Sequence, residues 1–152
     1  MKVHFIGVGK MGLPMARHLA AAGHSVTVSD PSMERCQLAR AQGLAVSTSP
    51  AAAMAAAEVV LSSLPNDAAL LAVAAQVAAH AHVGAIYVDT STVSLQASAE
   101  AAQALAAKGV LYLRCTVSGN NKMAEAAQLT VMASGPRAAY NTVLPLLRTL
   151  GP

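Results

Sequence analysis

The sequence predicts an α/β fold in which a mostly parallel, doubly wound β-sheet carries helices on both faces. Short runs rich in β-branched residues alternate with longer alanine-rich segments along the whole 152-residue chain. This alternation is typical of β-α-β units, whose right-handed crossovers place helices on both faces of a parallel sheet. Hydrophobic residues make up 55% of the chain and charged residues 11%, which favours a buried core over disorder. The length fits one domain.

Seven short segments have the composition of buried strands. The first is an apolar run that ends at a glycine, and Asp30-Pro31 closes the second. Near-continuous apolar runs are typical of parallel strands, because these are buried on both faces. The expected strands cover residues 2–7, 25–29, 44–47, 58–62, 85–88, 110–113 and 129–132.

The segments between these strands have helical composition and clear end signals. Gly23, Gly43 and Gly109 follow three of them, and glycine commonly ends a helix because it adopts a left-handed conformation easily. Pro14 is compatible with the first helix because it falls in the first turn. The expected helices cover residues 10–22, 31–42, the alanine-rich segment opened by Ser49-Pro50, the segment after Pro65-Asn66-Asp67, and residues 94–108 and 136–151.

A glycine-rich turn connects the first expected strand with the first expected helix. Between a strand and a helix, the first glycine of a G-x-G-x-x-G pattern permits a tight turn, and the second lets the backbone approach a pyrophosphate. The third brings the helix close to the sheet, and the helix N-terminus adds free N–H groups. The matching residues are Gly7, Val8, Gly9, Lys10, Met11 and Gly12. They predict a Rossmann-type dinucleotide-binding domain over residues 1–152, with an ordinary strand-to-helix turn as the alternative.

An acidic residue follows the second expected strand, where it can select the cofactor. Asp30 lies about twenty residues beyond the glycine turn, and a carboxylate there accepts hydrogen bonds from ribose hydroxyls. The same carboxylate repels a 2′-phosphate, so NAD is favoured. NADP stays possible because Arg35 lies nearby and can clamp a phosphate. Asp30 can also cap the helix expected to begin at Pro31.

Four expected loops should meet at one edge of the sheet. Ligands of doubly wound sheets bind outside the carboxyl ends of the strands. The loops after the first, fourth, fifth and sixth strands are rich in small hydroxyl, amide and glycine residues, which suit a sugar or a carboxylate. Each loop alone indicates little, because such loops are common in this fold. They cover residues 7–12, 63–66, 89–92 and 114–121.

Composition argues against several other classes of protein. The net charge of +3 is not gathered in a run, and three tyrosines and one phenylalanine offer few stacking platforms, so no nucleic-acid partner is expected. Cys36 and Cys115 are far apart in the sequence and do not form a C-x-x-C motif. Two such cysteines are typical of reduced thiols in an intracellular protein. No signal peptide and no membrane span are expected, which favours the cytoplasm. His80 and His82 do not share a helical face, so no metal site is expected.

Several motifs, in order along essentially the whole chain, resemble those of the β-hydroxyacid dehydrogenases. That family includes 3-hydroxyisobutyrate dehydrogenase and is related to 6-phosphogluconate dehydrogenase. Several motifs in the right order are far more specific than one glycine turn. The motifs are residues 7–19 with 22–26, Leu64-Pro65, residues 88–93, Val117-Ser118-Gly119, and residues 129–132 with Ser134-Gly135.

The resemblance implies reversible hydride transfer between a nicotinamide and a small β-hydroxyacid or its semialdehyde or keto form. It implies that Leu64, Pro65 and Thr92 line the nicotinamide half of the site, and that Ser118 and Gly119 hydrogen-bond the substrate carboxylate. The family's general acid/base is a lysine of a second, all-helical domain that also completes the dimer. That domain is absent from this chain, so the chain alone is expected to catalyse little and bind cofactor weakly, and the full-length protein to be a homo-oligomer.

The substrate loop departs from the family pattern Asp-Ala-Pro-Val-Ser-Gly-Gly. Arg114 stands in place of the acid, Thr116 in place of the proline, and Asn120 in place of the second glycine. We expect Asn120 to narrow the substrate pocket and to add amide donors and acceptors. The substrate therefore stays open, and an imine-reductase-like enzyme half is one alternative. A stand-alone NAD(P)-sensing domain is another, because a fold does not fix a function.

Overall fold

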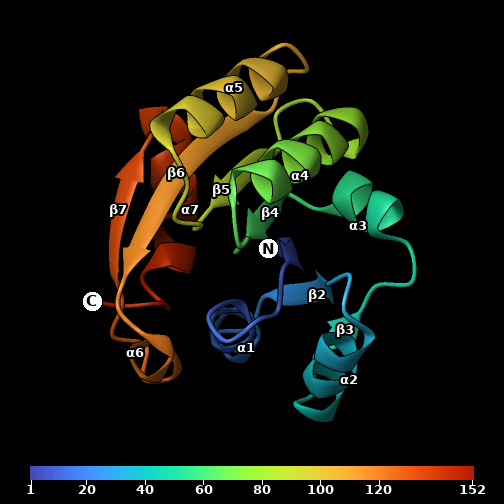
Figure 1. The fold of residues 1–152 in the computed structure, drawn as a ribbon, viewed down its shortest axis with the longest axis vertical. Coiled ribbons are helices and arrows are strands. Elements are labelled where there is room, and N and C mark those ends of the chain that lie inside the picture. The colour runs from blue at the N-terminus through green and yellow to red at the C-terminus, as the bar shows by residue number, and fades with distance from the viewer.

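Seven strands form one sheet with the mostly parallel, doubly wound topology that the sequence predicts (Figure 1). The computed structural model describes all 152 residues. The strands are β1 (Lys2–Ile6), β2 (Ser25–Ser29), β3 (Ala45–Val46), β4 (Val59–Ser62), β5 (Ile86–Asp89), β6 (Leu111–Ser118) and β7 (Thr130–Ser134). Their order is β3-β2-β1-β4-β5-β6-β7, and only the β6–β7 pair is antiparallel. The strand order reverses between β3 and β4, so the switch point where such folds bind ligands lies between β1 and β4.

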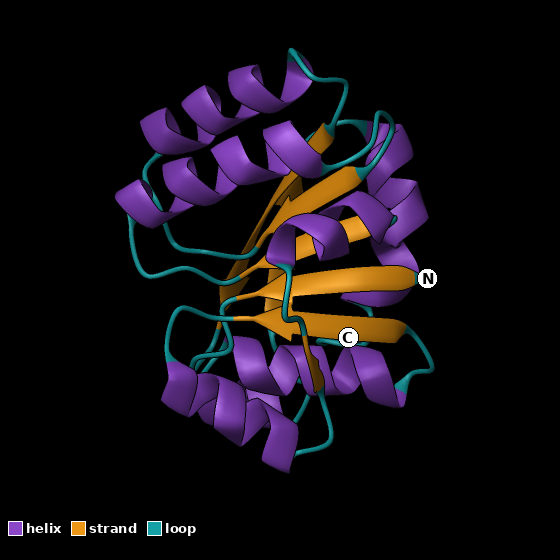
Figure 2. Ribbon diagram, turned by 90° about the vertical axis from the view of Figure 1, so that its right-hand side faces the viewer, coloured by secondary structure: helices purple, strands orange, loops and turns teal.

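Helices cover both faces of the sheet. They are α1 (Gly12–Ala21), α2 (Met33–Ala41), α3 (Pro50–Ala56), α4 (Asp67–His80), α5 (Leu95–Ala106), α6 (Asn121–Glu125) and α7 (Arg137–Leu147). One core joins the sheet to α1, α2, α6 and α7, and the other joins it to α3, α4 and α5. Figure 2 shows the two layers of helices with the parallel strands pointing to a common edge between them. None of the helices has the length and hydropathy that a membrane crossing requires.

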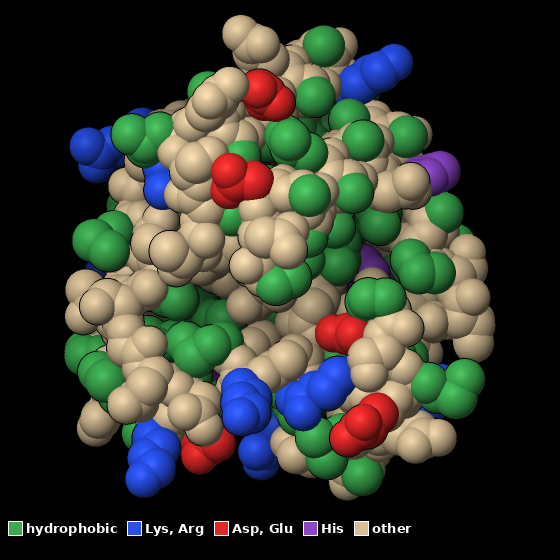
Figure 3. All heavy atoms as spheres, in the orientation of Figure 1, with side chains coloured by type: hydrophobic (Ala, Val, Ile, Leu, Met, Phe, Trp, Pro, Cys, Tyr) green, Lys and Arg blue, Asp and Glu red, His purple; other side chains and the backbone are tan.

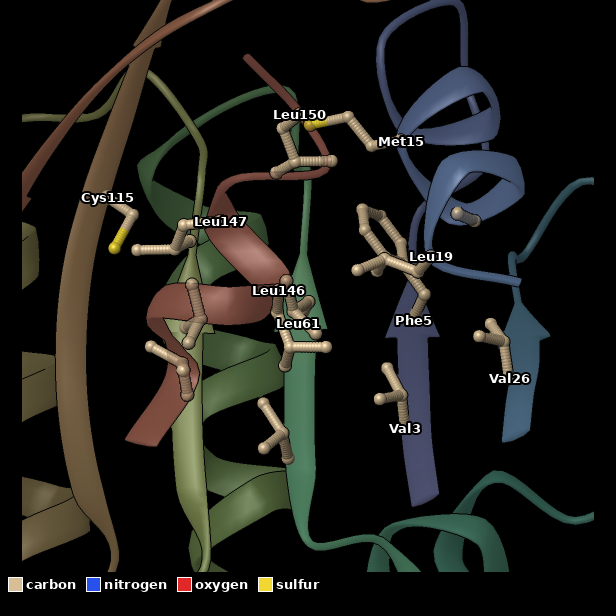
Figure 4. Packing of buried hydrophobic residues seen from close by; sticks show 14 of the residues in the cluster. Val3, Phe5, Met15, Leu19, Val26, Leu61, Cys115, Leu146, Leu147 and Leu150 are labelled. Carbon is tan, nitrogen blue, oxygen red and sulfur yellow. The ribbon is translucent and has the colours of Figure 1, made fainter. Parts of the chain in front are cut away.

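The core between the sheet and α1 is built from large apolar side chains. Phe5 of β1 is fully buried and points toward Met15 and Leu19 of α1 (Figure 4). Leu146 of α7 is buried in the same cluster beside Leu61 of β4. Burying a side chain of this size contributes roughly 1.5–3 kcal/mol. This packing fixes α1 against the carboxyl end of β1, where the glycine turn lies.

Most helices begin with a side-chain cap, and α1 does not. Ser32, Ser49, Asn66, Ser94 and Asn120 each accept a hydrogen bond from a backbone N–H in the first turn of the helix they precede. Such caps satisfy N–H groups that the helix itself leaves unpaired. Helix α1 has neither a side-chain cap nor an acidic residue in its first turn. Its first N–H groups are therefore free for another acceptor.

The structure corrects two sequence-based expectations. Helix α2 begins at Met33 with Ser32 as its N-cap, so the alternative in which Asp30 caps this helix is wrong. Strand β6 continues to Ser118, so residues 114–118 are strand rather than loop, because they pair with β7. A short helix, α6, then follows the Asn120 cap.

Candidate cofactor site

The glycine turn has the backbone geometry that its motif predicts. Gly7 has a φ of +94°, and a Cβ there would overlap the carbonyl oxygen of Ser63. A Cβ at Gly12 would overlap the carbonyl oxygen of Gly7, so α1 packs directly on the turn. At Gly9, by contrast, no heavy atom outside residues 8–10 lies within 4 Å of the position of a Cβ. The backbone at Gly9 is therefore open to a ligand.

Four consecutive backbone N–H groups at the start of α1 have no hydrogen-bond partner within the chain. They belong to residues 9–12, and the first N–H bonded inward is that of Leu13, which donates to the Gly9 carbonyl oxygen at 3.0 Å. Unpaired N–H groups and the positive end of a helix dipole together bind anions. These amides and the open backbone of Gly9 fit a diphosphate.

Asp30 lies at the carboxyl end of β2 and braces the glycine turn. Its Oδ2 accepts from the Val8 N–H at 2.9 Å, and its Oδ1 accepts from the Ser32 N–H at 2.8 Å. Arg35 Nε donates to the Val8 carbonyl oxygen at 2.8 Å, so both groups hold the same peptide segment. A carboxylate oxygen accepts more than one hydrogen bond, so Asp30 retains capacity for ribose hydroxyls. Its contact with ribose stays a prediction.

The loops after β4 and β5 meet the glycine turn at the same edge of the sheet. The Leu64 side chain comes within 3.6 Å of the Cβ position of Gly7, and the Leu64 N–H donates to Ser91 Oγ at 2.7 Å. Pro65 and Thr92 are exposed on these two loops. The structure thus brings the predicted nicotinamide-side residues onto adjacent loops, and their contact with a cofactor stays a prediction.

Strand β6 carries the predicted substrate residues past the carboxyl end of β5, where β6 pairs only with β7. Arg114 pairs in register with Asp89, the last residue of β5, so the rest of β6 extends past that strand. Ser118 and the following Gly119 are exposed there. Asn120 Oδ1 accepts from the Met123 N–H at 3.0 Å. The cap uses the amide oxygen of Asn120 and leaves its amide nitrogen for a ligand.

A hydrogen bond joins α1, which follows the glycine turn, to α6, which follows the substrate strand β6. His18 Nε2 of α1 lies 2.8 Å from the carbonyl oxygen of Ala124 in α6. Nε2 must therefore carry the hydrogen, since the carbonyl oxygen only accepts. This bond ties the cofactor-side helix to the segment that follows Ser118.

Cationic side chains gather beside the glycine turn. Lys10, Arg17 and Arg35 line a hollow of about 200 Å³ between α1, α2 and α6, and Glu125 also lines it. Figure 3 shows lysine and arginine side chains over these helices, on the face toward which the parallel strands point. Such a positive surface favours an anionic ligand.

Other reactive residue types take no part in this edge. Burial raises the pKa of the Cys115 thiol to about 12, so it stays protonated and unreactive. His80 and His82 are exposed at the end of α4, and Lys122 is exposed on α6. The chain holds no cluster of three histidine, cysteine, aspartate or glutamate side chains that could bind a metal ion.

A family profile described as the NAD binding domain of 6-phosphogluconate dehydrogenase matches residues 2–152. This chain belongs to that family. The match includes the glycine turn, Asp30 and the loops that converge on them, so the geometry described above is that of an NAD(P)-binding domain of the 6-phosphogluconate dehydrogenase type.

The relatives of this NAD-binding domain include longer proteins that are named as dehydrogenases. A probable 3-hydroxyisobutyrate dehydrogenase of Mycobacterium tuberculosis is 34% identical over 97% of this chain and 50% of the relative. A solved structure of M. tuberculosis 3-hydroxyisobutyrate dehydrogenase with L-serine has a TM-score of 0.94, covering 98% of this chain and 51% of that one, at 34% identity. Psf3 in complex with NADP⁺ and 2-OPP has a TM-score of 0.90 at 31% identity, with 98% and 54% covered. This chain thus spans about half the length of these relatives.

Sequence reasoning overlooked one part of this NAD-binding domain. Asp89 was expected only as the first residue of the loop 89–92, yet its carboxylate accepts from the hydroxyls of both Ser62 and Ser91. The Asp-x-Ser spacing after a strand was the available signal, because an aspartate side chain often accepts from the N–H two residues on. The partnership with Ser62 depends on strand register and has no local signal.

Proposed function

We propose that this chain is the cofactor-binding half of an NAD(P)-dependent β-hydroxyacid dehydrogenase. The observation that carries the proposal is the open backbone at Gly9 beside four unpaired N–H groups of residues 9–12. No residue of the chain occupies this place, and the positive face around it suits a dinucleotide. The similarity to 3-hydroxyisobutyrate dehydrogenase supports the choice of reaction class.

In this proposal three groups of residues at the sheet edge each bind a different part of the cofactor. The amides of residues 9–12 hold the diphosphate, and Asp30 accepts from the adenosine ribose hydroxyls. Leu64, Pro65 and Thr92 line the nicotinamide half, and the hydrogen bond from the Leu64 N–H to Ser91 Oγ joins the two loops that carry them. When bound, the nicotinamide supplies the hydride acceptor or donor.

The substrate is proposed to be a small carboxylate beside the nicotinamide. The Ser118 hydroxyl and the Gly119 N–H are donors at the exposed end of β6, and the Asn120 amide nitrogen adds a third. The exposed Lys122 is not assigned as general base. We place that base, together with the surfaces of a homo-oligomer, in a helical domain outside this chain, and we place the protein in the cytoplasm, where free thiols such as Cys36 and Cys115 persist.

Calorimetric titration with NADH and NADPH tests the cofactor site directly. We expect saturable binding of the two nucleotides in the micromolar to roughly millimolar range, with NADH the tighter ligand. Absence of binding of both ligands at millimolar concentration would overturn the proposal. Assay of the chain alone with 3-hydroxy acids and NAD⁺ is expected to give no turnover.

The substitution Asp30→Asn is expected to narrow the preference for NADH over NADPH. It removes the charge that repels a 2′-phosphate and leaves Arg35 in place, so the ratio of the two affinities should shift toward NADPH by about tenfold. Glu34→Gln, which removes an exposed charge in the first turn of α2, is the matched control and should leave the ratio unchanged. An unaltered ratio in Asp30→Asn would mean that Asp30 does not face the ribose.

A further inference from the structure

A buried polar network ties together the loops that follow β4 and β5. Ser62, Asp89 and Arg114 occupy one row across three adjacent strands, because Ser62 pairs with Asp89 and Asp89 with Arg114. The fully buried Asp89 uses a single oxygen, Oδ1, to accept from Ser62 Oγ at 2.8 Å and from Ser91 Oγ at 2.5 Å. The same oxygen accepts from the Ser91 N–H at 3.2 Å.

The directions of these hydrogen bonds follow from the carboxylate. An ionised carboxylate only accepts, so both serine hydroxyls donate to Asp89. Ser62 Oγ can then accept from the Tyr87 hydroxyl, 2.6 Å away, and Ser91 Oγ accepts from the Leu64 N–H at 2.7 Å. One hydroxyl therefore connects the backbone of Leu64 to the charge of Asp89.

Arg114 holds the end of the loop that follows β5, which covers residues 90–93. Its Nη2 donates to the Val93 carbonyl oxygen at 3.0 Å. Its Nε and the Oδ2 of Asp89 are both buried without a partner, on paired positions of neighbouring strands. Burial raises the pKa of Asp89, while the hydrogen bonds from Ser91 and Ser62 and the charge of Arg114 act against that rise.

We propose that Asp89 and Arg114 are positioning residues for the nicotinamide half of the cofactor site. Asp89 fixes the start of the loop of residues 90–93 through Ser91, and Arg114 fixes its end through Val93. Thr92 lies exposed between these two anchors, and the Leu64 backbone is bound to the first of them. Neither charged group needs to touch the cofactor. The inference rests on the proposed function, because it concerns the same bound nucleotide.

The test compares NADH with ADP-ribose, which lacks the nicotinamide. Calorimetry on the chain measures both ligands with wild type and with Arg114→Met, which removes the donor to Val93. We expect NADH to bind about fivefold more weakly and ADP-ribose to change by less than about twofold, since one hydrogen bond to a remote loop is lost. Arg114→Lys, which keeps a cationic donor, should recover part of the loss. Arg137→Met at the exposed start of α7 is the matched control and should bind both ligands as wild type does.

Ser91→Ala perturbs the same loop at its other end, and it tests the proposal if Arg114→Met does not fold. It removes the link between Leu64 and Asp89, and it should also weaken NADH selectively. Equal weakening of NADH and ADP-ribose, no weakening of either, or equal affinity of the two ligands in wild type would overturn the positioning role. Failure of wild type to bind either ligand would instead overturn the proposed function itself.

Discussion

Gly9→Val is expected to abolish detectable NADH binding and to leave the free energy of unfolding within about 0.5 kcal/mol of wild type. The side chain would project into the space that the diphosphate is proposed to fill, where no heavy atom outside residues 8–10 lies within 4 Å of the Cβ position. Its Cβ would therefore meet the ligand and not the rest of the protein. Because the unpaired N–H groups of residues 9–12 would lose their acceptor, we expect at least about a hundredfold loss of affinity.

Gly12→Ala is the contrasting case, because a Cβ at this position would meet the protein itself. A Cβ at Gly12 would overlap the Gly7 carbonyl oxygen, and the nearest Phe5 ring carbon would lie 3.2 Å away. The turn or α1 must shift to admit it, which costs about 1–3 kcal/mol or more. Urea unfolding measures the stability of both variants, and calorimetry measures their affinity for NADH. A folded Gly9→Val variant that binds NADH like wild type would show that the diphosphate lies elsewhere.

The sheet and the glycine turn could be predicted because their signals are local. The parallel strands are short and rich in β-branched or other apolar residues, and the residues of the turn lie next to each other in the sequence. The conformation of Gly7 and the close packing at Gly12 follow from the same few residues. Local signals of this kind also indicated the caps at Ser49 and, in the loop before α4, the turn around Asn66.

The rest of the site depends on partners that are distant in sequence. Residues 114–118 extend β6 because β7 returns antiparallel beside them, and a loop-like composition does not reveal that pairing. Ser32 rather than Asp30 caps α2, while the Asp30 carboxylate accepts from the Val8 N–H of the glycine turn and from the Ser32 N–H. The roles of Asp89 and Arg114 likewise need the register of three strands. Sequence reasoning therefore found the residues at the edge more readily than the residues that hold the edge together.

Between pH 4 and 7, the largest pH effect on stability is expected from His4, which is fully buried in β1. Its Nδ1 lies 2.8 Å from Thr27 Oγ1, and its Nε2 lies 3.0 Å from Ser29 Oγ. Neutral imidazole satisfies both contacts, with one nitrogen donating and the other accepting. Burial lowers the pKa of His4 from 6.5 to about 4, and the hydrogen bond with Thr27 acts weakly in the opposite direction.

The sign of the effect follows from which state binds the proton more readily. The unfolded chain takes up the proton near pH 6.5, and the folded chain takes it up only near pH 4. Stability is therefore fully present above pH 6.5 and falls as the pH drops toward 4. A shift of this size corresponds to about 3 kcal/mol over that window. Asp89, whose pKa burial raises, contributes in the opposite direction, so the total pH profile of wild type mixes the two effects.

The difference between wild type and His4→Gln isolates the histidine. Glutamine keeps a donor and an acceptor and does not titrate, so the contributions of Asp89 and of the other carboxylates cancel in the difference. Urea unfolding of both proteins between pH 4 and 7 should show wild type losing stability relative to His4→Gln as the pH falls. His24→Gln serves as the companion control, because that half-buried histidine should change the profile less than His4 does; its pKa is lowered by burial and then by the N-terminal charge. A flat difference curve, or an NMR titration of the His4 ring with a midpoint near 6.5, would show that the ring reaches solvent and that the β1–β2 contact is looser than the hydrogen bonds indicate.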